Sequence, residues 1–194
     1  MKRISWIPTA LSLVVVMASC NNSADGDAKK EADSANEAKA DTTSQSATPT
    51  ILVDEKTAAF MVKIADAGLT EVQLGQLAQD KGKSKSVKDF GAMMVKDHSA
   101  AGDELKGIAV RKNVTLPAVP GDAHQKEITD LTQATKFDKD YIDAMVKGHK
   151  DVVDELEKAS KDVTDGDVKV FIDKTLPVVR GHLDEAKKIQ KMLK

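Results

Sequence analysis

Four ionisable side chains lie on the apolar faces of four predicted long helices: Glu71, His98, His149 and His182. Each helical residue turns the chain by about 100°, so residues three or four positions apart share a face. His98 follows Met94 by one turn, and His149 follows Met145 in the same way. Glu71 falls within about 20° of Phe60 on its own helix. A single inward histidine is an ordinary core residue, but one polar group on every helix indicates a shared site.

The four side chains are also expected at one level along the helices. At a rise of about 1.5 Å per residue, each lies roughly 18 to 27 Å from the hairpin turn next to it. All four therefore sit near the middle of their helices, whichever end the second turn occupies. We expect them to converge in the interior.

Three imidazoles and one carboxylate are borderline ligands that suit zinc, iron, manganese or copper. We therefore predict that Glu71, His98, His149 and His182 bind one transition-metal ion, as facing helices of a bundle core can do. The alternative is a buried hydrogen-bonded layer without metal. In that layer Glu71 accepts from one or two histidines, and Tyr141 or a water completes the network. Both interpretations fit the sequence.

Neighbouring residues narrow the metal chemistry. A bridged di-iron centre needs a carboxylate three residues before each of two histidines, and here Val95 and Val146 occupy those positions. Oxidase chemistry of that kind is therefore not expected. Met94 and Met145 are additional soft ligands that would favour copper if they bound it, although buried methionines more often fill a core.

Other polar residues are assigned no part in this site. The carboxylates that fall off the apolar faces are Asp66, Asp97, Glu104, Asp154 and Glu185. Asp97 is expected to be solvated, and His124 has no predicted role. Arg180 is expected to be a solvated or helix-capping charge.

The spacing of apolar residues predicts an all-α fold. The predicted ranges are 56–79, 87–112, 138–160 and 167–192 for long helices, and 123–134 for a short one. Pro177 should kink the last helix because it removes a backbone hydrogen bond. Two hairpins joined by a long connection containing the short helix indicate a ferritin-like four-helix bundle. An up-down-up-down bundle with a decorated loop fits nearly as well.

Composition limits the function classes. The 194-residue chain has a formal net charge of -2 and only 3% aromatic residues. Basic clusters are absent, so nucleic acid is not an expected partner. The sequence shows no nucleophile with a paired base and no phosphate-binding glycine loop, so an enzyme is less expected than a binding or structural protein.

The N-terminal region predicts export and anchoring. Residues 1–19 resemble a lipoprotein signal peptide, and Met17-Ala18-Ser19-Cys20 resembles the lipobox of bacterial lipoproteins, which predicts lipidation at Cys20. Residues 20–50 are polar and are predicted to be a flexible tether, and residues 51–194 form the helical domain. We therefore expect a lipid-anchored protein of the bacterial cell envelope, at the outer membrane or its periplasmic face, whose N-terminal lipid is its membrane contact.

Four segments carry a family resemblance: "AGLTEVQLGQLA", "VKDFGAMMVKDH", "FDKDYIDAMVKGHKDVV" and "TLPVVRGHLDEAKKI". They are similar to the bacterial envelope family designated domain of unknown function 4142, often labelled an outer membrane protein, over about residues 54–190. The resemblance implies a ferritin-like bundle and supplies no reaction. The residues that match its motif positions are Glu71, Asp97, His98, Tyr141, His149, Pro177 and His182. Gly148 departs from the pattern, because the family often has an acidic residue there.

Overall fold

The computed structural model describes residues 26–40 and 51–193, and the regular structure within these ranges is entirely helical. The six helices are α1 (Ala28–Ala40), α2 (Glu55–Lys81), α3 (Lys85–Lys112), α4 (Asp122–Thr132), α5 (Phe137–Asp162) and α6 (Gly166–Met192). The predicted all-α class is confirmed. Each predicted end of α2 to α6 lies within two residues of the observed end.

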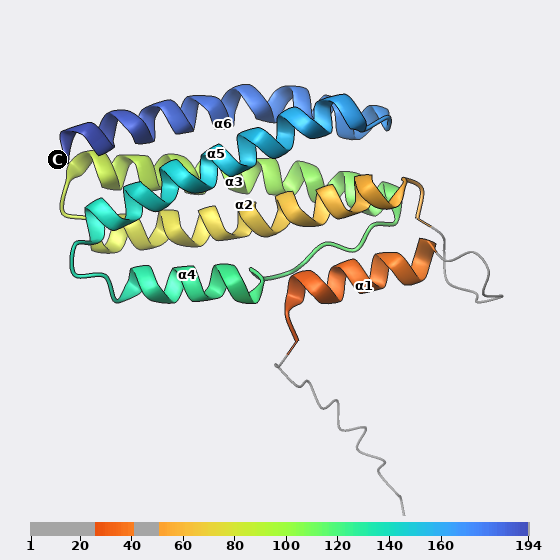
Figure 1. Ribbon diagram of the computed structural model, residues 1–194, viewed down its shortest axis with the longest axis horizontal. Coiled ribbons are helices and arrows are strands. Elements are labelled where there is room, and N and C mark those ends of the chain that lie inside the picture. The colour runs from red at the N-terminus through yellow and green to blue at the C-terminus, as the bar shows by residue number, and fades with distance from the viewer. Residues whose placement is uncertain (1–25, 41–50, 194) are drawn as a thin grey trace, which may run out of the picture.

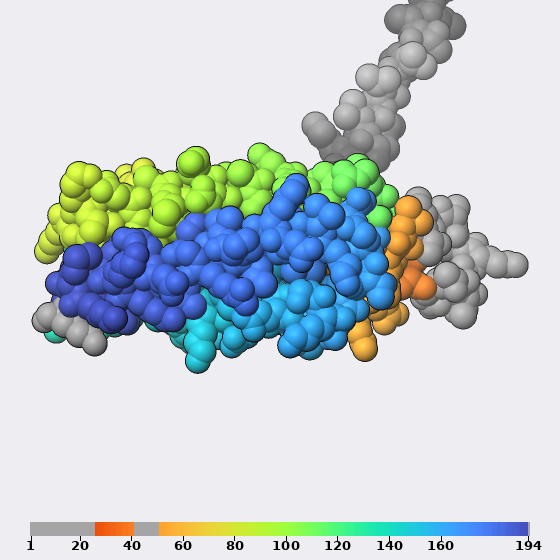
Figure 2. Space-filling model, turned by 90° about the horizontal axis from the view of Figure 1, so that it is seen from above, coloured from red at the N-terminus to blue at the C-terminus, as the bar shows by residue number. Residues whose placement is uncertain are grey.

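The four long helices lie side by side, with α1 and α4 along one flank (Figure 1). α2 packs against α3 and α5, and α6 packs against α5 and α3. The space-filling view shows α6 lying alongside α3 (Figure 2). After α3, residues 113–121 and α4 run back along the long helices, so α5 runs in the same direction as α3 (Figure 1).

Local sequence sets several helix ends. Asp54 caps α2, because its Oδ1 accepts from the backbone N–H of Thr57 at 2.9 Å. Asp165 caps α6 by accepting from the N–H groups of the first helical residues. Asn113 ends α3 in the left-handed conformation, with a φ of 55°, which asparagine tolerates better than most residues. α6 continues through Pro177, and the predicted kink there stays a prediction.

The apolar core is divided by the level of the four predicted polar residues. One buried cluster is formed by the N-terminal parts of α2 and α6 with the C-terminal parts of α3 and α5, and it includes Phe60, Leu105 and Phe171. A second cluster lies towards the opposite ends of these helices and includes Phe90 and Ile189. Burial in these two clusters holds the long helices in register on both sides of the polar level.

α2 and α3 approach each other closely next to this level. A Cβ added at Gly75 would lie 2.7 Å from the carbonyl oxygen of Gly91, and one added at Gly91 would lie 2.6 Å from the carbonyl oxygen of Gly75. Real Cβ atoms do not approach an oxygen so closely, so only glycine fits either position. The pair fixes α2 against α3 about one turn from Glu71 and two turns from His98.

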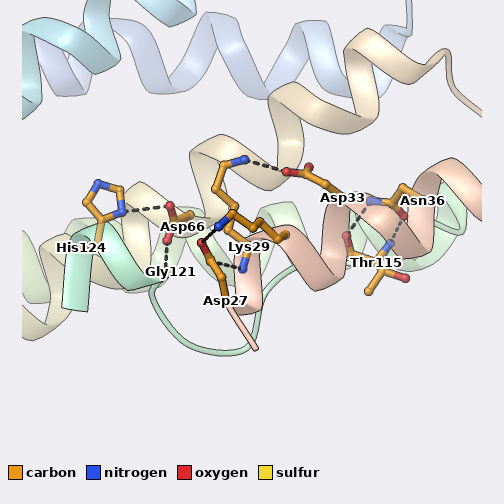
Figure 3. A network of polar contacts seen from close by, with 9 residues as sticks. Asp27, Lys29, Asp33, Asn36, Asp66, Thr115, Gly121 and His124 are labelled. Atoms are coloured by element: carbon orange, nitrogen blue, oxygen red, sulfur yellow. Dashed lines mark hydrogen bonds and ion pairs between the residues drawn. The ribbon is translucent and has the colours of Figure 1, made fainter. Parts of the chain in front are cut away.

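The predicted flexible tether is wrong for residues 28–40, which form α1. Ala32 and Asn36 share one face of this helix and are buried against the domain. The Asn36 side chain donates to the carbonyl of Thr115 at 2.9 Å and accepts from the Thr115 N–H at 2.7 Å (Figure 3). The segment lacks large apolar residues, so its composition resembled a tether. Helix-forming alanine and lysine residues and a paired polar anchor order it instead.

The predicted signal peptide and the lipidated Cys20 lie outside the described residues. Among the described helices, none combines the length and the hydrophobicity that crossing a membrane requires.

Candidate metal centre

Three of the four predicted residues bring their imidazoles together between the two apolar clusters. One potential ligand nitrogen from each of His98, His149 and His182 lies within 4.8 Å of the other two. The ring centroids are 5.3 to 5.6 Å apart. We call these three residues the histidine triad. His149 and His182 are 1% and 3% exposed, and His98 is partly buried.

Each imidazole of the triad keeps one buried ring nitrogen without a hydrogen-bond partner in the described part of the chain: Nε2 of His98, Nε2 of His149 and Nδ1 of His182. In His149 and His182, the other ring nitrogen has a hydrogen-bond partner outside the triad. Nδ1 of His149 donates to the carbonyl of Met145 at 2.9 Å, and Nε2 of His182 lies 3.0 Å from Oδ2 of Asp97. A partner on the outer nitrogen fixes the ring orientation and leaves the lone pair on the inner nitrogen.

Burial keeps the triad uncharged. Burial first, and then the neighbouring His149 and His182, together lower the pKa of His98 to about 3. Burial and His182 lower the pKa of His149 to about 4, against the opposing bond to Met145. The pKa of His182 is lowered by burial and partly restored by Asp97. Neutral imidazoles are the form that binds metal ions.

Glu71 reaches the same level but does not join the converging nitrogens. Its Oε1 lies 3.5 Å from Nδ1 of His149, the nitrogen already bonded to Met145. Burial and then the nearby Glu127 raise the pKa of Glu71 to about 8, so the carboxyl is protonated at neutral pH. The contact is therefore between two neutral groups and is not an ion pair. Gly148 leaves room for this carboxyl, because a Cβ there would lie 3.3 Å from Oε1.

The predicted neighbours of the site are all in the core. Tyr141 is fully buried, stacks on Phe137 and meets the ring of Phe90 edge-on. Its hydroxyl has no hydrogen-bond partner among the described residues, and burial raises its pKa. Met94 and Met145 are buried in the second apolar cluster, as core methionines are.

Two polar pairs were missed by the sequence prediction. Asp97 was expected to be solvated but bonds to His182 across the α3–α6 contact. Asp66, which falls off the apolar face of α2, is buried beneath α4. It accepts from the N–H of Gly121 at 2.7 Å and pairs with Nδ1 of His124 at 2.9 Å (Figure 3). Both carboxylates lie on the flank of a helix that another helix covers. In the sequence, only the position of Asp97 directly before His98 indicated that one of these carboxylates lies near the site.

The sequence assigned no part in the site to Arg180 or His124. Arg180 pairs with Glu157 on the surface at 2.7 Å, as a solvated charge would. His124 is hydrogen-bonded to Asp66 and lies outside the triad, so this one remaining histidine of the chain offers an internal control for the other three.

Comparison with known proteins places the chain in a family without a defined activity. The model of the family described as domain of unknown function DUF4142 matches residues 30–189. That range begins inside α1 and ends near the end of α6, so it covers the triad and its flanking helices. The searches of curated proteins and of solved structures gave no match.

Proposed function

This chain belongs to the DUF4142 family, and we propose that its helical domain binds one transition-metal ion through His98, His149 and His182. The ion would be zinc, copper, iron or manganese, and the role would be metal handling or stress protection. Three imidazole nitrogens suit all of these ions.

The convergence of three imidazoles, each with one buried and unpaired ring nitrogen, supports this proposal most directly. A buried polar atom without a partner costs roughly 1–3 kcal/mol, and each of the three rings carries one. A metal ion would satisfy all three together. The outer hydrogen bonds from His182 to Asp97 and from His149 to the Met145 carbonyl are of the kind that support ligating histidines in metalloproteins.

The same atoms also bear on the hydrogen-bonded layer. That interpretation requires the unpaired nitrogens to bond to Glu71, to Tyr141 or to a water. The unpaired nitrogens, Glu71 Oε2 and the Tyr141 hydroxyl lack partners among the described residues, so such a layer would have to be completed by water. Glu71 lies beside Nδ1 of His149, so we propose that it positions His149 and does not bind the metal ion itself.

Stoichiometric metal uptake tests the proposal. The full chain is stripped with a chelator, reloaded separately with zinc, copper, iron and manganese, desalted and measured for metal per chain. We expect one tightly bound equivalent of at least one of these metals. Cobalt(II) substitution should give the visible absorption bands of a nitrogen-ligated ion. Saturating metal at 100 times its Kd should stabilise the fold by about 2.7 kcal/mol.

Single substitutions make the test specific to the triad. His149→Ala and His182→Ala should each abolish stoichiometric binding. His124→Ala is the matched control, because it removes a histidine that lies outside the triad. The proposal is wrong if His124→Ala lowers metal content as much as the triad variants, or if the wild type takes up none of the four metals while its folding is intact.

Architecture and location complete the proposal. We assign the four long helices to a ferritin-like four-helix bundle, supported by the shared direction of α3 and α5 across the long connection (Figure 1). We also propose that the protein is anchored in the bacterial envelope by lipid on Cys20, on the strength of the lipobox-like residues 17–20. Metabolic labelling with a fatty acid tests the anchor. Label retained in Cys20→Ala would exclude it.

A further inference from the structure

The three histidines of the triad are not held alike. Nδ1 of His149 is bonded to the carbonyl of Met145 and Nε2 of His182 to Asp97, and both imidazoles are almost completely buried. His98 is the partly buried member, and no described residue forms a hydrogen bond with either of its ring nitrogens. An outer hydrogen bond fixes the orientation of a ligating ring. The ring of His98 lacks this restraint.

A pocket of about 380 Å³ reaches the triad at His98. Its walls come from α2, α3 and α6, with Val152 of α5 and two residues of the 113–121 connection, and we call it the α2–α3 pocket. His149 and His182 are not in its wall. Two larger pockets in the described part of the chain, of about 550 and 620 Å³, have no triad residue in their walls. The α2–α3 pocket therefore gives access to the triad from the side of His98.

Missing side chains keep this approach open. Gly102 follows His98 by one turn of α3, so a side chain at Gly102 would lie on the same face and lean towards His98. A Cβ added at Gly102, or at Gly68 of α2, would meet no atom within 4 Å. Both glycines line the α2–α3 pocket, so it has free space at these two positions.

The α2–α3 pocket is large enough for an ion that still carries water. Its volume corresponds to about a dozen water molecules at about 30 Å³ each. Ser99 and Thr175 in its wall have hydroxyl oxygens that can accept from such waters. The exposed Asp103 and Lys106, also in the wall, pair with each other at 3.4 Å, so together they add no net charge that would repel a cation.

We propose that metal ions reach the triad through the α2–α3 pocket and meet His98 first, and that His98 is the movable ligand of the centre. His149 and His182 are its fixed ligands. Entry by this route rests on the proposed metal binding and gives the three ligands different roles. The space beside His98 lets its ring turn towards the pocket to meet the ion and turn back to bring it to the other two.

Reaction with diethyl pyrocarbonate tests the difference between the three histidines without any metal. The reagent modifies accessible, unprotonated imidazole nitrogens. The full chain is kept in chelator at about pH 7, and peptide mass spectrometry gives the rate at each histidine. We expect His98 to react about tenfold faster or more than His149 and His182, because reaction at a fully buried ring requires local opening of the fold.

Substitutions in the pocket wall test the path to His98. Gly68→Leu and Gly102→Leu place a side chain in the pocket, so each should slow the reaction of His98 by about tenfold. Gly181→Leu is the matched control, because it lies on α6 outside the pocket wall and its added Cβ also meets nothing within 4 Å. It should leave the rate at His98 unchanged. His124, which is outside the wall, should react at the wild-type rate in every variant.

Uptake of cobalt(II) tests the route for the ion itself. The full chain is mixed with cobalt(II) in a stopped-flow instrument, and the visible absorption bands of the bound ion are followed. Gly68→Leu and Gly102→Leu should slow uptake by about tenfold, because an obstructed path lowers the rate of association. Both variants should reach the final metal content of the wild type, and Gly181→Leu should match the wild type in rate as well.

The proposal is overturned if His149 or His182 reacts with diethyl pyrocarbonate as fast as His98. It is also overturned if all three glycine variants take up cobalt at the wild-type rate, or if Gly181→Leu slows uptake as much as the two pocket variants. A folded wild type that takes up no metal overturns the metal proposal together with this one. Metal uptake at one rate in all variants overturns only the entry route.

Discussion

Asp97 of α3 and His182 of α6 meet across a helix–helix contact, with Oδ2 of Asp97 3.0 Å from Nε2 of His182. The carboxylate is 29% exposed, whereas the imidazole is almost completely buried. The bond therefore joins the solvent-facing edge of α3 to the interior of the triad. It leaves Nδ1 of His182 as the buried ring nitrogen without a hydrogen-bond partner among the described residues.

Asp97→Asn should weaken metal binding by about 10- to 100-fold without removing the site, because outer-shell partners of ligating histidines contribute that much. The measurement is a competition titration against a chelator of known affinity. Asp103→Asn, an exposed carboxylate on the same helix, is the control. Equal affinities in the two variants would show that the Asp97 bond does not support a metal ligand.

Gly75→Ala should lower the free energy of unfolding by about 1–3 kcal/mol, the usual cost of overpacking. The added methyl would meet the Gly91 carbonyl at 2.7 Å, so α2 and α3 must separate. Urea denaturation followed by circular dichroism measures the change. Gly181→Ala, where the methyl meets nothing, should instead stabilise the protein by about 0.5–1 kcal/mol. A Gly75→Ala variant as stable as Gly181→Ala would refute the close approach.

The His124–Asp66 pair should make stability depend on pH. The hydrogen bond that His124 donates to the Asp66 carboxylate raises the pKa of His124, against partial burial, and nearby Glu127 and Asp27 act in the same direction as Asp66. A histidine whose pKa is raised by folding stabilises the fold fully below its unfolded value of about 6.5. The stabilisation is lost as pH rises through the folded value.

The stability difference between wild type and His124→Gln should therefore be largest near pH 5.5 and shrink steadily towards pH 9. Urea denaturation at each pH, in chelator, measures it. Because the same triad is present in both proteins, its own titration cancels in the difference. A difference that grows with pH would show that His124 is not stabilised in its charged form.

Asn36→Ala should release α1 from the domain. The substitution leaves the N–H and the carbonyl of Thr115 without their partner, which costs about 1–3 kcal/mol for a buried group. Hydrogen exchange of the α1 amides and of the Thr115 amide should accelerate, while the amides of α5 and α6 keep their protection. Ser34→Ala, on the exposed face of α1, is the control and should leave exchange unchanged. Unaltered exchange in both would mean that α1 is held by other contacts.

Residues whose positions depend on their own helix were predicted well. Local spacing defines the apolar face of a helix, and that face must be buried whatever covers it. The inward placement of His149 and His182 followed from this alone. Asp97 and Asp66 could not be placed in the same way. Each lies off the apolar face of its helix, and only the identity of the neighbouring helix makes it a partner of His182 or of His124.

The sequence by itself determined helices α2 to α6, their inward faces and the common level of four polar residues, because these depend on the periodicity and rise of a helix. Tertiary structure decided which of the four converge. The packing of α3, α5 and α6 brings three imidazoles within 4.8 Å, while the position of α2 leaves Glu71 beside the outer edge of His149. It also decided that α1 is ordered, because Asn36 finds its partner in Thr115, 79 residues further along the chain. Such pairings depend on distances between helices, which no single helix encodes.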